Sequence, residues 1–398
     1  MDPDVGTAVS YETLQWDIAP SAAYVRSAQR QRGTYDAAIA ADIADLTVDL
    51  PADALVDAED ASNEIIRFDA ELGGEIAPFA AILLRTESAA SSNIENLTAS
   101  VRAIAEAELT GARASANARV IVANTAAMVA AINLADNIDG DAILAMHEAL
   151  MHDADPTAAG RWRTQQVWIG GSAHGPRAAM FVPPHHRRVP DAIDDLLRFT
   201  ARGDLPVLPQ IALAHAQFET IHPFTDGNGR TGRALIQAML RHRGLTRSVT
   251  VPVSAGLLTD TDSYFAALTA YRDGDPAPIV RRVSEAAVAA VFNGRRLVDD
   301  LRGIRATWSG VVTARRDSAV WRIVELLLRR PVINTALLAE ELGIESKHAR
   351  RHLEPLAHAG VLVETSSGPR QRIWRAPEVI DALDAFAERA RRGGPLSR

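Results

Sequence analysis

The 398-residue sequence predicts a mainly α-helical protein with one β-hairpin in its body and a small basic domain at its C-terminal end. Three observations carry this prediction. Alanine and leucine recur at helical spacing through most of the chain. A short β-prone stretch interrupts them near the middle, and the charge changes sign near residue 300. A chain of this length is expected to fold as two or three domains.

Helical spacing is clearest in three segments of the body: 36–46 (DAAIAADIADL), 120–136 (VIVANTAAMVAAINLAD) and 141–152 (DAILAMHEALMH). Asp, Asn, Gly or Pro bounds each of them, and these residues are common at helix ends. We therefore predict a helix in each segment. Two more helices are predicted over 211–220 and 231–241, on either side of a loop that contains proline and glycine.

The β-prone stretch is residues 164–182 (TQQVWIGGSAHGPRAAMFV). Two short runs that favour strands flank a centre with glycine, serine and proline. This order is typical of a β-hairpin.

The composition excludes several classes of site and predicts a cellular location. The chain has no cysteine, so it has no disulfide framework, thiolate zinc site or cysteine nucleophile. Its first residues lack the basic and then apolar order of a secretion signal, and no apolar run approaches the ~20 residues of a membrane span. We expect a cytoplasmic protein without a membrane partner.

The charge of the chain is divided unevenly. Residues 301–398 carry 17 Lys and Arg against 11 Asp and Glu, whereas residues 1–300 carry 25 against 39. The C-terminal part is therefore basic and the body is acidic. Nucleic acid is the first partner to consider for a basic domain of this kind.

The loop between the last two predicted helices has the groups needed to bind a polyanion. It reads HPFTDGNGRTGR over residues 222–233. The backbone amides of Gly227, Asn228 and Gly229 open onto a helix N-terminus, where N–H groups and the helix dipole favour phosphate. Arg230 and Arg233 lie three residues apart at the start of that helix, so both can reach the same anion.

Two further residues of the loop predict a reaction at that anion. Asp226 lies beside the predicted phosphate site and is suited to Mg²⁺, which takes oxygen ligands and shares them with phosphates. His222 has the side chain whose pKa lies nearest neutrality, so it can take a proton from an attacking hydroxyl.

The loop resembles the signature of the Fic family, H-x-F-x-[DE]-G-N-G-R-x-x-R. Every fixed position of that signature is matched, namely by His222, Phe224, Asp226, Gly227, Asn228, Gly229, Arg230 and Arg233. The resemblance implies a mostly α-helical Fic fold and a reaction that transfers AMP from ATP to a Ser, Thr or Tyr hydroxyl of a protein.

The resemblance also implies a role for each residue of the loop. His222 is then the general base and Asp226 the Mg²⁺ ligand. The three residues after Asp226 cradle the phosphates of ATP, and Arg230 supports the loop and the triphosphate. Arg233 binds the γ-phosphate and orients the α-phosphate for attack, while Phe224 packs the loop on the core.

Two other segments resemble functional parts of the Fic fold. The predicted hairpin matches the position of the flap that holds a target segment by strand addition, with Val167, Trp168 and Ile169 as candidates for target contact. Tyr264 is a candidate contact for adenine. Plain packing in a hairpin or in the core explains these residues equally well.

An upstream segment resembles the inhibitory motif of the Fic family, [ST]-x-x-x-E-[GN]. Ser91, Glu95 and Asn96 occupy its fixed positions. The resemblance implies that Glu95 pairs with Arg233. Because an arginine engaged by a carboxylate cannot also bind the γ-phosphate, the enzyme is expected to inhibit itself.

The basic C-terminal part resembles a winged helix-turn-helix. Three predicted helices precede a predicted hairpin over residues 317–376, with a glycine turn at Gly343. The candidate DNA contacts are Lys347, Arg350 and Arg351 on the third helix, with Arg370, Arg372 and Arg375 in the wing. A docking or dimerisation surface is the alternative, so a second copy of the chain is a further candidate partner.

We therefore predict three regions: an N-terminal helical region (1–105) that carries the inhibitory helix, a catalytic domain (106–300) and a winged-helix domain (301–398). The leading function is that of a self-inhibited protein adenylyltransferase that uses ATP and Mg²⁺. The alternatives are a DNA-binding regulator with a nucleotide-sensing domain, and an enzyme of the same fold that transfers UMP or phosphate or removes AMP.

Overall fold

A computed structural model gives the fold of the chain. It describes residues 6–17, 26–73, 76–111, 114–366 and 372–392. Helices predominate, and the chain divides into two compact units, each made of separate stretches of sequence. The first unit comprises residues 1–62, 126–244 and 262–284, and the second comprises 63–125, 245–261 and 285–398. No helix of the described ranges is long and apolar enough to cross a membrane.

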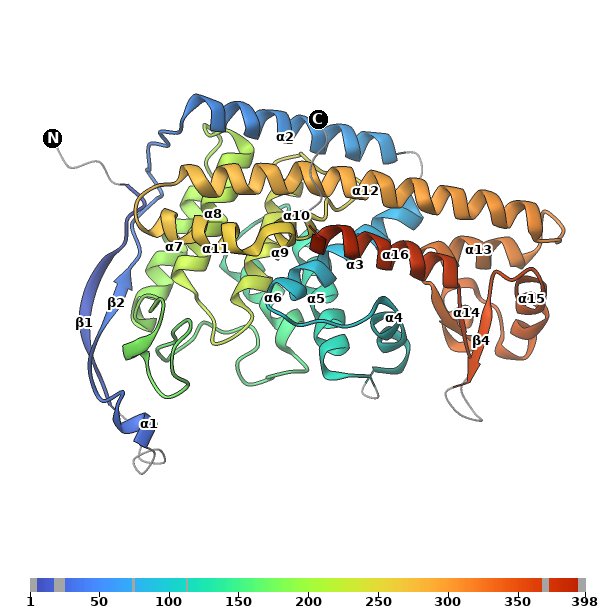
Figure 1. Cartoon of the computed structure of the whole chain (residues 1–398), viewed down its shortest axis with the longest axis horizontal. Coiled ribbons are helices and arrows are strands. Elements are labelled where there is room, and N and C mark those ends of the chain that lie inside the picture. The colour runs from blue at the N-terminus through green and yellow to red at the C-terminus, as the bar shows by residue number, and fades with distance from the viewer. Residues whose placement is uncertain (1–5, 18–25, 74–75, 112–113, 367–371, 393–398) are drawn as a thin grey trace. The chain divides into compact units, whose positions relative to one another are not determined.

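The first unit contains a two-stranded ribbon and a helical core (Figure 1). Its elements are β1 (Ser10–Trp16), α1 (Arg26–Gln29), β2 (Gly33–Ile39), α6 (Gly140–Met151), the 3₁₀ turns η3 (Pro176–Ala178) and η4 (His186–Arg188), α7 (Val189–Thr200), α8 (Val207–Ile221), α9 (Asn228–His242) and α11 (Thr261–Arg272). Helices α8 and α9 pack against each other, and α8 is buried from Leu208 to Ile221. A helix that is buried on all sides lies at the centre of a core.

The second unit is built around α3 (Ile76–Ile94), which packs against α10, α13 and α16. Its other elements are α4 (Val101–Thr110), α10 (Val253–Leu257), the 3₁₀ turn η5 (Leu258–Asp260), α13 (Ala319–Arg329), β3 (Val332–Asn334), α14 (Thr335–Leu342), α15 (Ser346–His358), β4 (Val363–Ser366), β5 (Arg372–Arg375) and α16 (Pro377–Arg392). Helices α2 (Ala52–Leu72), α5 (Ala116–Asn133) and α12 (Ala277–Val311) each contribute several residues to both units. The boundary expected at residue 300 lies inside α12.

Four of the five helices predicted in the body are confirmed, and the one over 36–46 is wrong. Residues 33–39 form β2, which pairs antiparallel with β1, from Gly33 opposite Trp16 to Ile39 opposite Ser10. Ala37 and Ala38 are fully buried, and the Ala38 N–H donates to the Val182 carbonyl at 2.9 Å. Burial and pairing with a distant segment override the helix propensity of alanine here.

The C-terminal elements contain the three helices that the sequence predicts and one strand more than the predicted hairpin. The three antiparallel strands lie in the order β3-β5-β4. Gly343 ends α14 in the left-handed conformation, with a φ of 67°, at the predicted glycine turn. Assignment of these elements as a winged helix stays a prediction.

Replacing Gly256 by alanine is expected to lower the free energy of unfolding by about 2–3 kcal/mol. A Cβ atom at this position of α10 would lie 1.9 Å from the backbone oxygen of Ala286 in α12. Because that atom is backbone, only a shift of the two helices relieves the clash. Urea denaturation of the variant measures the loss.

The control for this prediction is Gly303→Ala, in the exposed part of α12. Nothing lies within 4 Å of the Cβ that this change adds. Because alanine favours a helix more than glycine does, the control is expected to stabilise the protein by up to ~1 kcal/mol. Equal unfolding energies for the two variants would contradict the prediction.

Candidate active site

The loop over residues 222–227 joins α8 to α9 in the first unit and brings the predicted base next to a helix N-terminus. Helix α8 ends because His222 adopts the left-handed conformation, with φ 51° and ψ 62°, and Pro223 follows. Gly227 is also left-handed, with a φ of 77°, and caps the start of α9. A Cβ at Gly227 would lie 2.9 Å from the Leu150 side chain, so glycine suits this position on two grounds.

The side chain of Asn228 holds the loop closed. Its Oδ1 accepts the Phe224 N–H at 2.8 Å, and its Nδ2 donates to the Phe224 carbonyl at 2.9 Å. The side chain is therefore used inside the loop, and the backbone of Asn228 and Gly229 remains for ligand binding. The first amides of an α-helix have no acceptor within the helix, so these two amides suit an anion.

Asp226 lies at the edge of this anion site with its side chain 69% exposed. Its Oδ1 accepts the Gly227 N–H at 2.6 Å and lies 3.3 Å from Arg230 Nη2. Within the described residues, no group of three or more His, Asp or Glu side chains could hold a metal ion. Since protein-bound Mg²⁺ commonly uses one or two carboxylates and the oxygens of a phosphate substrate, Asp226 fits Mg²⁺ as part of an ATP complex.

Both arginines of the loop point into the protein from the first turns of α9. The side chain of Arg230 is 5% exposed, and Arg233 is 2% exposed. Buried guanidinium groups require charged or hydrogen-bonded partners. Arg230 and Arg233 therefore put two positive charges close to the N-terminal amides of α9.

His147, which the sequence did not single out, supports the loop from α6. It is fully buried, and its ring stacks on Phe224 with 3.6 Å between centroids and an angle of 1°. Its Nδ1 accepts the Gly160 N–H at 3.1 Å, so Nε2 carries the proton and donates to the Asp226 carbonyl, also at 3.1 Å. His147 thus contacts the loop next to the predicted metal ligand.

Arg163 is a second support that the sequence analysis missed. Its guanidinium donates to the carbonyl oxygens of His222, Gln165 and Pro184, with 2.8 Å between Nε and the His222 oxygen. Its own N–H donates to the Pro223 carbonyl at 2.9 Å. Burial lowers the pKa of Arg163 to about 10, so the group stays charged at neutral pH. These bonds stabilise the left-handed backbone of His222.

The environment of His222 keeps its imidazole neutral. Burial is the largest cause that lowers the pKa of His222, followed by the positive charges of Arg163 and Arg272. Its Nδ1 has no hydrogen-bond partner and lies 3.9 Å from Glu219 Oε2. A neutral imidazole beside an anion-binding helix N-terminus can accept a proton from a hydroxyl group.

Acidification is expected to destabilise the protein through its buried histidines. Burial lowers the pKa values of His147 and His215, which are buried, and of His222, whose side chain is 20% exposed. Below the ordinary value of 6.5 the unfolded chain binds protons that the folded chain does not, so stability falls as the pH falls. The loss approaches ~1.4 kcal/mol per pH unit for each histidine that stays neutral in the fold.

Urea denaturation at about pH 7.5 and about pH 5.5 measures this loss. The variant His215→Gln is expected to lose less stability between the two values than the parent. His174→Gln, at an exposed histidine, is the matched control and should behave as the parent does. An unchanged pH dependence in His215→Gln would show that this histidine titrates normally.

Residues 137–240 match the sequence model of the Fic/DOC family. This segment contains the loop, the anion site and both supporting residues. Over these residues the chain is similar to the Fic/DOC family.

Named proteins and solved structures are similar to this chain. It is 33% identical over 156 residues to "Protein adenylyltransferase fic-1" of Caenorhabditis elegans, which covers 39% of this chain and 28% of that protein. It is 33% identical over 153 residues to "Protein adenylyltransferase Fic" of Nematostella vectensis, covering 38% and 33%. The chain thus spans a third or less of the length of these curated relatives.

A Fic family protein from Desulfovibrio desulfuricans G20 is similar over 83% of this chain and 97% of its own, with a TM-score of 0.52 and 24% identity. This similarity shows a shared fold. The predicted Fic fold and its mainly helical character are therefore confirmed.

The predicted flap beside the Fic loop reverses direction but does not form two strands. Ile169 bridges Phe181, with the Ile169 N–H donating to the Phe181 carbonyl at 2.8 Å, and Ser172 bridges Gly175. The hairpin prediction is wrong in this respect. Gly170 and Gly171 turn the chain with φ values of 73° and 77° between the two bridges, so neither bridge extends into a ladder.

The candidate target contacts of the flap, Val167, Trp168 and Ile169, are half-buried. Trp168 packs edge-on against Trp16 of β1 at 5.2 Å between centroids, and its Nε1 donates to the Ser172 carbonyl at 2.8 Å. Trp168 thus has a structural role in the ribbon, and a role of the three residues in target binding stays a prediction.

Tyr264 lies in the core of the first unit and is 1% exposed. Its hydroxyl lies 2.7 Å from His215 Nε2. The ring offers no open face to a base in this structure, whereas the adjacent Phe265 is 49% exposed. Adenine contact by Tyr264 stays a prediction.

The segment that resembles the inhibitory motif ends α3 in the second unit. Ser91 is fully buried, Glu95 is half-buried, and Asn96 adopts a positive φ of 61° that ends the helix. Asn124 of α5 anchors the last turns of α3, since its Nδ2 donates to the Ser88 carbonyl at 2.9 Å and to Ser92 Oγ at 3.2 Å. The pairing of Glu95 with Arg233 stays a prediction.

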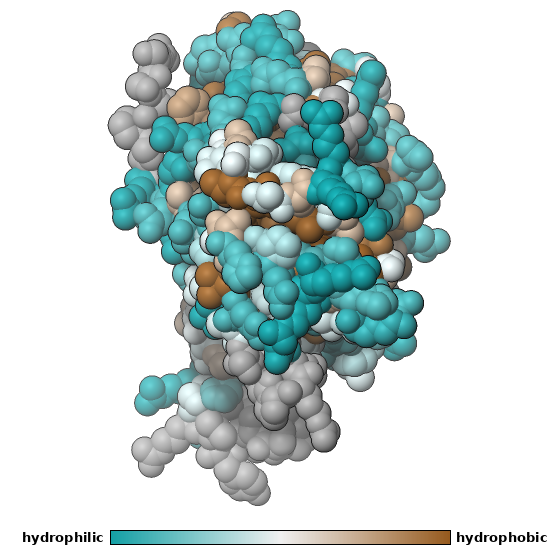
Figure 2. All heavy atoms as spheres, turned by 90° about the vertical axis from the view of Figure 1, so that its right-hand side faces the viewer, coloured by the Kyte–Doolittle hydropathy of each residue, from teal (hydrophilic) through white to brown (hydrophobic). Residues whose placement is uncertain are grey.

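Four of the candidate DNA contacts are exposed, namely Lys347, Arg350, Arg351 and Arg372, whereas Arg375 is half-buried. Nearby carboxylates compensate several of them. The pairs are Lys347 with Glu345 at 2.6 Å, Arg350 with Glu354 at 3.0 Å, and Arg372 with Glu364 at 3.4 Å. Arg351 is exposed, and Arg370 lies outside the described residues. Figure 2 shows that hydrophilic side chains cover most of the face at this end of the molecule, with a band of apolar ones across it.

Proposed function

We propose that this chain is a protein adenylyltransferase that transfers AMP from ATP to a Ser, Thr or Tyr hydroxyl of a protein, itself included. The observation that carries the proposal is the complete Fic loop, which begins at His222 after α8 and leads into the N-terminus of α9. Burial lowers the pKa of His222, which suits a base. The names of the similar proteins support it.

In the proposed reaction His222 takes the proton of the acceptor hydroxyl. The hydroxyl oxygen forms a bond to the α-phosphorus of ATP, and the bond from that phosphorus to the bridging oxygen breaks. Pyrophosphate leaves with the electron pair of the broken bond. Positioning and charge stabilisation supply most of the catalysis in such reactions.

The remaining residues of the loop bind and orient the triphosphate. The amides of Asn228 and Gly229 and the dipole of α9 receive a phosphate, and Arg230 and Arg233 add two positive charges. When bound by Asp226, Mg²⁺ neutralises phosphate charge. His147 and Arg163 keep the loop in the shape that this arrangement requires.

The enzyme is proposed to inhibit itself through Glu95. If this carboxylate pairs with Arg233, the γ-phosphate loses its ligand and ATP binds in an unproductive pose. The segment of Val167, Trp168 and Ile169 is proposed to hold the target near the acceptor hydroxyl.

Intact-mass measurement of the protein after incubation with ATP and Mg²⁺ tests the proposed function. The expected product is protein with one or more added AMP groups. An increase that matches phosphate would instead indicate a different transfer, and UTP in place of ATP tests for UMP. Absence of any mass change in Glu95→Gly protein would remove the basis of the proposal.

Among the C-terminal residues that the structure describes, no contact favours DNA as a partner over protein. The paired carboxylates reduce the positive charge that the third helix offers to phosphates. Duplex DNA binding that falls steeply with added salt, without AMP transfer, would support the alternative of a DNA-binding regulator.

A further inference from the structure

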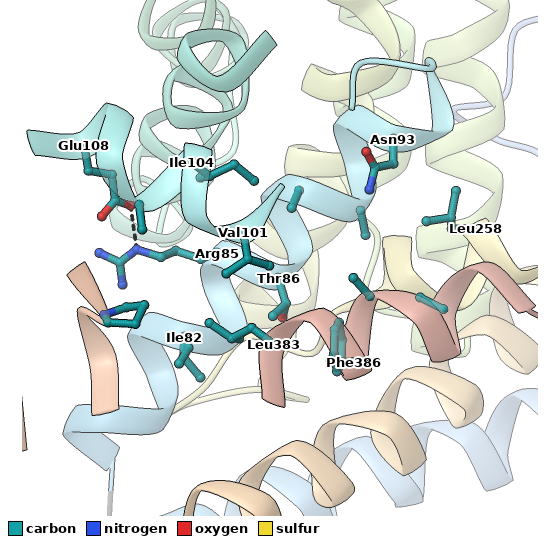
Figure 3. A pocket seen from close by; sticks show the side chains of 16 residues that line it. Ile82, Arg85, Thr86, Asn93, Val101, Ile104, Glu108, Leu258, Leu383 and Phe386 are labelled. Carbon is teal, nitrogen blue, oxygen red and sulfur yellow. Dashed lines mark hydrogen bonds and ion pairs between the residues drawn. The ribbon is translucent and has the colours of Figure 1, made fainter. Parts of the chain in front are cut away.

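An apolar pocket lies inside the second unit, between α3, α4 and α16 (Figure 3). Its cavity volume is about 60 Å³, and the surrounding space that includes open solvent is about 660 Å³. Most of the side chains that line it are apolar, among them Ile82, Ile104, Leu258, Leu383 and Phe386. A mostly apolar lining with a few polar groups is common in pockets that hold small molecules.

The charged groups at one end of the pocket are already compensated. Arg85 Nε donates to Glu108 Oε1 at 2.6 Å, and Arg330 Nη1 donates to Glu108 Oε2 at 2.6 Å. Arg85 also donates to the Arg329 carbonyl at 3.0 Å. A charged ligand would have to compete with these contacts inside an apolar lining, so the pocket favours a neutral one.

Asn93 lines the pocket away from the Arg85–Glu108 pair (Figure 3). Its Oδ1 is buried and has no hydrogen-bond partner. Buried amide oxygens normally accept a hydrogen bond, so this atom marks a missing donor. The other polar side chain nearby, Thr86, already donates its hydroxyl to the Leu83 carbonyl at 2.8 Å.

We infer that this pocket binds a small neutral molecule, with an apolar body between α3, α4 and α16 and one N–H or O–H group that donates to Asn93. The helices that form the pocket supply the apolar contacts, and Asn93 selects for a donor.

This ligand also regulates the active site, a consequence that rests on the proposed function. Asn93 lies two residues before Glu95, and five other pocket residues belong to the same helix α3. A ligand stabilises the form that it binds. Because the pocket requires α3 in its present position, the ligand holds the helix that carries the inhibitory segment and strengthens inhibition.

Indole and 1-methylindole are a matched pair of probes, since only indole has an N–H donor. Isothermal titration calorimetry with the full-length protein is expected to give an affinity for indole about 3- to 10-fold higher than for 1-methylindole. In Asn93→Leu the two affinities become equal. No heat of binding for indole at about 1 mM would overturn the inference.

Two variants of α16 locate the binding. Ala387→Leu fills the pocket, since Ala387 is one of its lining residues, and is expected to lower indole affinity at least 10-fold. Ala385→Leu adds the same side chain outside the pocket lining and leaves affinity unchanged. Circular dichroism verifies that both variants fold. If the two variants bind indole with equal affinity, indole binds outside this pocket and the inference is wrong.

Regulation is tested by self-modification with labelled ATP in the presence of indole. Indole is expected to slow the wild-type protein and to leave Glu95→Gly unaffected. An equal effect on both proteins would contradict coupling through the inhibitory segment. If Glu95→Gly transfers no AMP, the proposed function fails, whereas the calorimetric test of the pocket still stands.

Discussion

Replacing His222 by alanine in Glu95→Gly protein is expected to lower the rate of AMP transfer about 100- to 10,000-fold, because the acceptor hydroxyl loses its base. The left-handed backbone at this position makes His222→Asn a useful second variant, since asparagine tolerates that conformation and cannot serve as an equivalent base. Initial rates of label transfer from α-labelled ATP to the protein measure both.

The control for this prediction is His358→Ala, at an exposed histidine of α15. It should retain the parental rate. If both His222 variants still bind ATP, their lower rates reflect a loss of catalysis and not a loss of the binding site. A rate within tenfold of the parent in His222→Ala would exclude His222 as the base.

Replacing Glu95 by glycine is expected to raise self-modification about 10- to 100-fold over the wild type. A charge-assisted hydrogen bond between a carboxylate and an arginine contributes about 1.5–3 kcal/mol, and its loss frees Arg233 for the γ-phosphate. Glu95 follows the last residue of α3, so glycine there interrupts no helix. The mass or label incorporated per minute measures the change.

Two variants show whether the carboxylate itself inhibits. Glu95→Gln keeps the size of the side chain and removes its charge, so it should activate less than glycine. Thr98→Gly loosens the backbone three residues further on and should have no effect. If Thr98→Gly activates as much as Glu95→Gly does, inhibition depends on the rigidity of the backbone in this segment and not on the carboxylate.

The helices of the body were predictable because their sequence periodicity matches their burial. The segments 120–136, 141–152, 211–220 and 231–241 all lie within or largely within helices of the structure. The segment 36–46 has the same composition, but its first residues pair with β1. Strand pairing depends on a partner elsewhere in the chain, which local spacing does not reveal.

The supports of the Fic loop could not be found from the sequence. His147 lies on the apolar face of a helix, where packing alone explains a buried residue. Arg163 lies in a short stretch without a helical or strand pattern. Only the fold brings the first against Phe224 and Asp226 and the second against the backbone of His222. Glu87, in the second unit, is another residue that the sequence did not single out. Its carboxylate accepts hydrogen bonds from the N–H and the hydroxyl of Ser254.

The sequence by itself determined the helical class and the chemical groups of the loop, because a catalytic motif and a helical period are written in consecutive residues. The tertiary structure decided what holds the loop in place and keeps His222 neutral. It also showed the pocket beside α3. These properties depend on burial and on contacts between residues far apart in the chain, and both arise only when the chain folds.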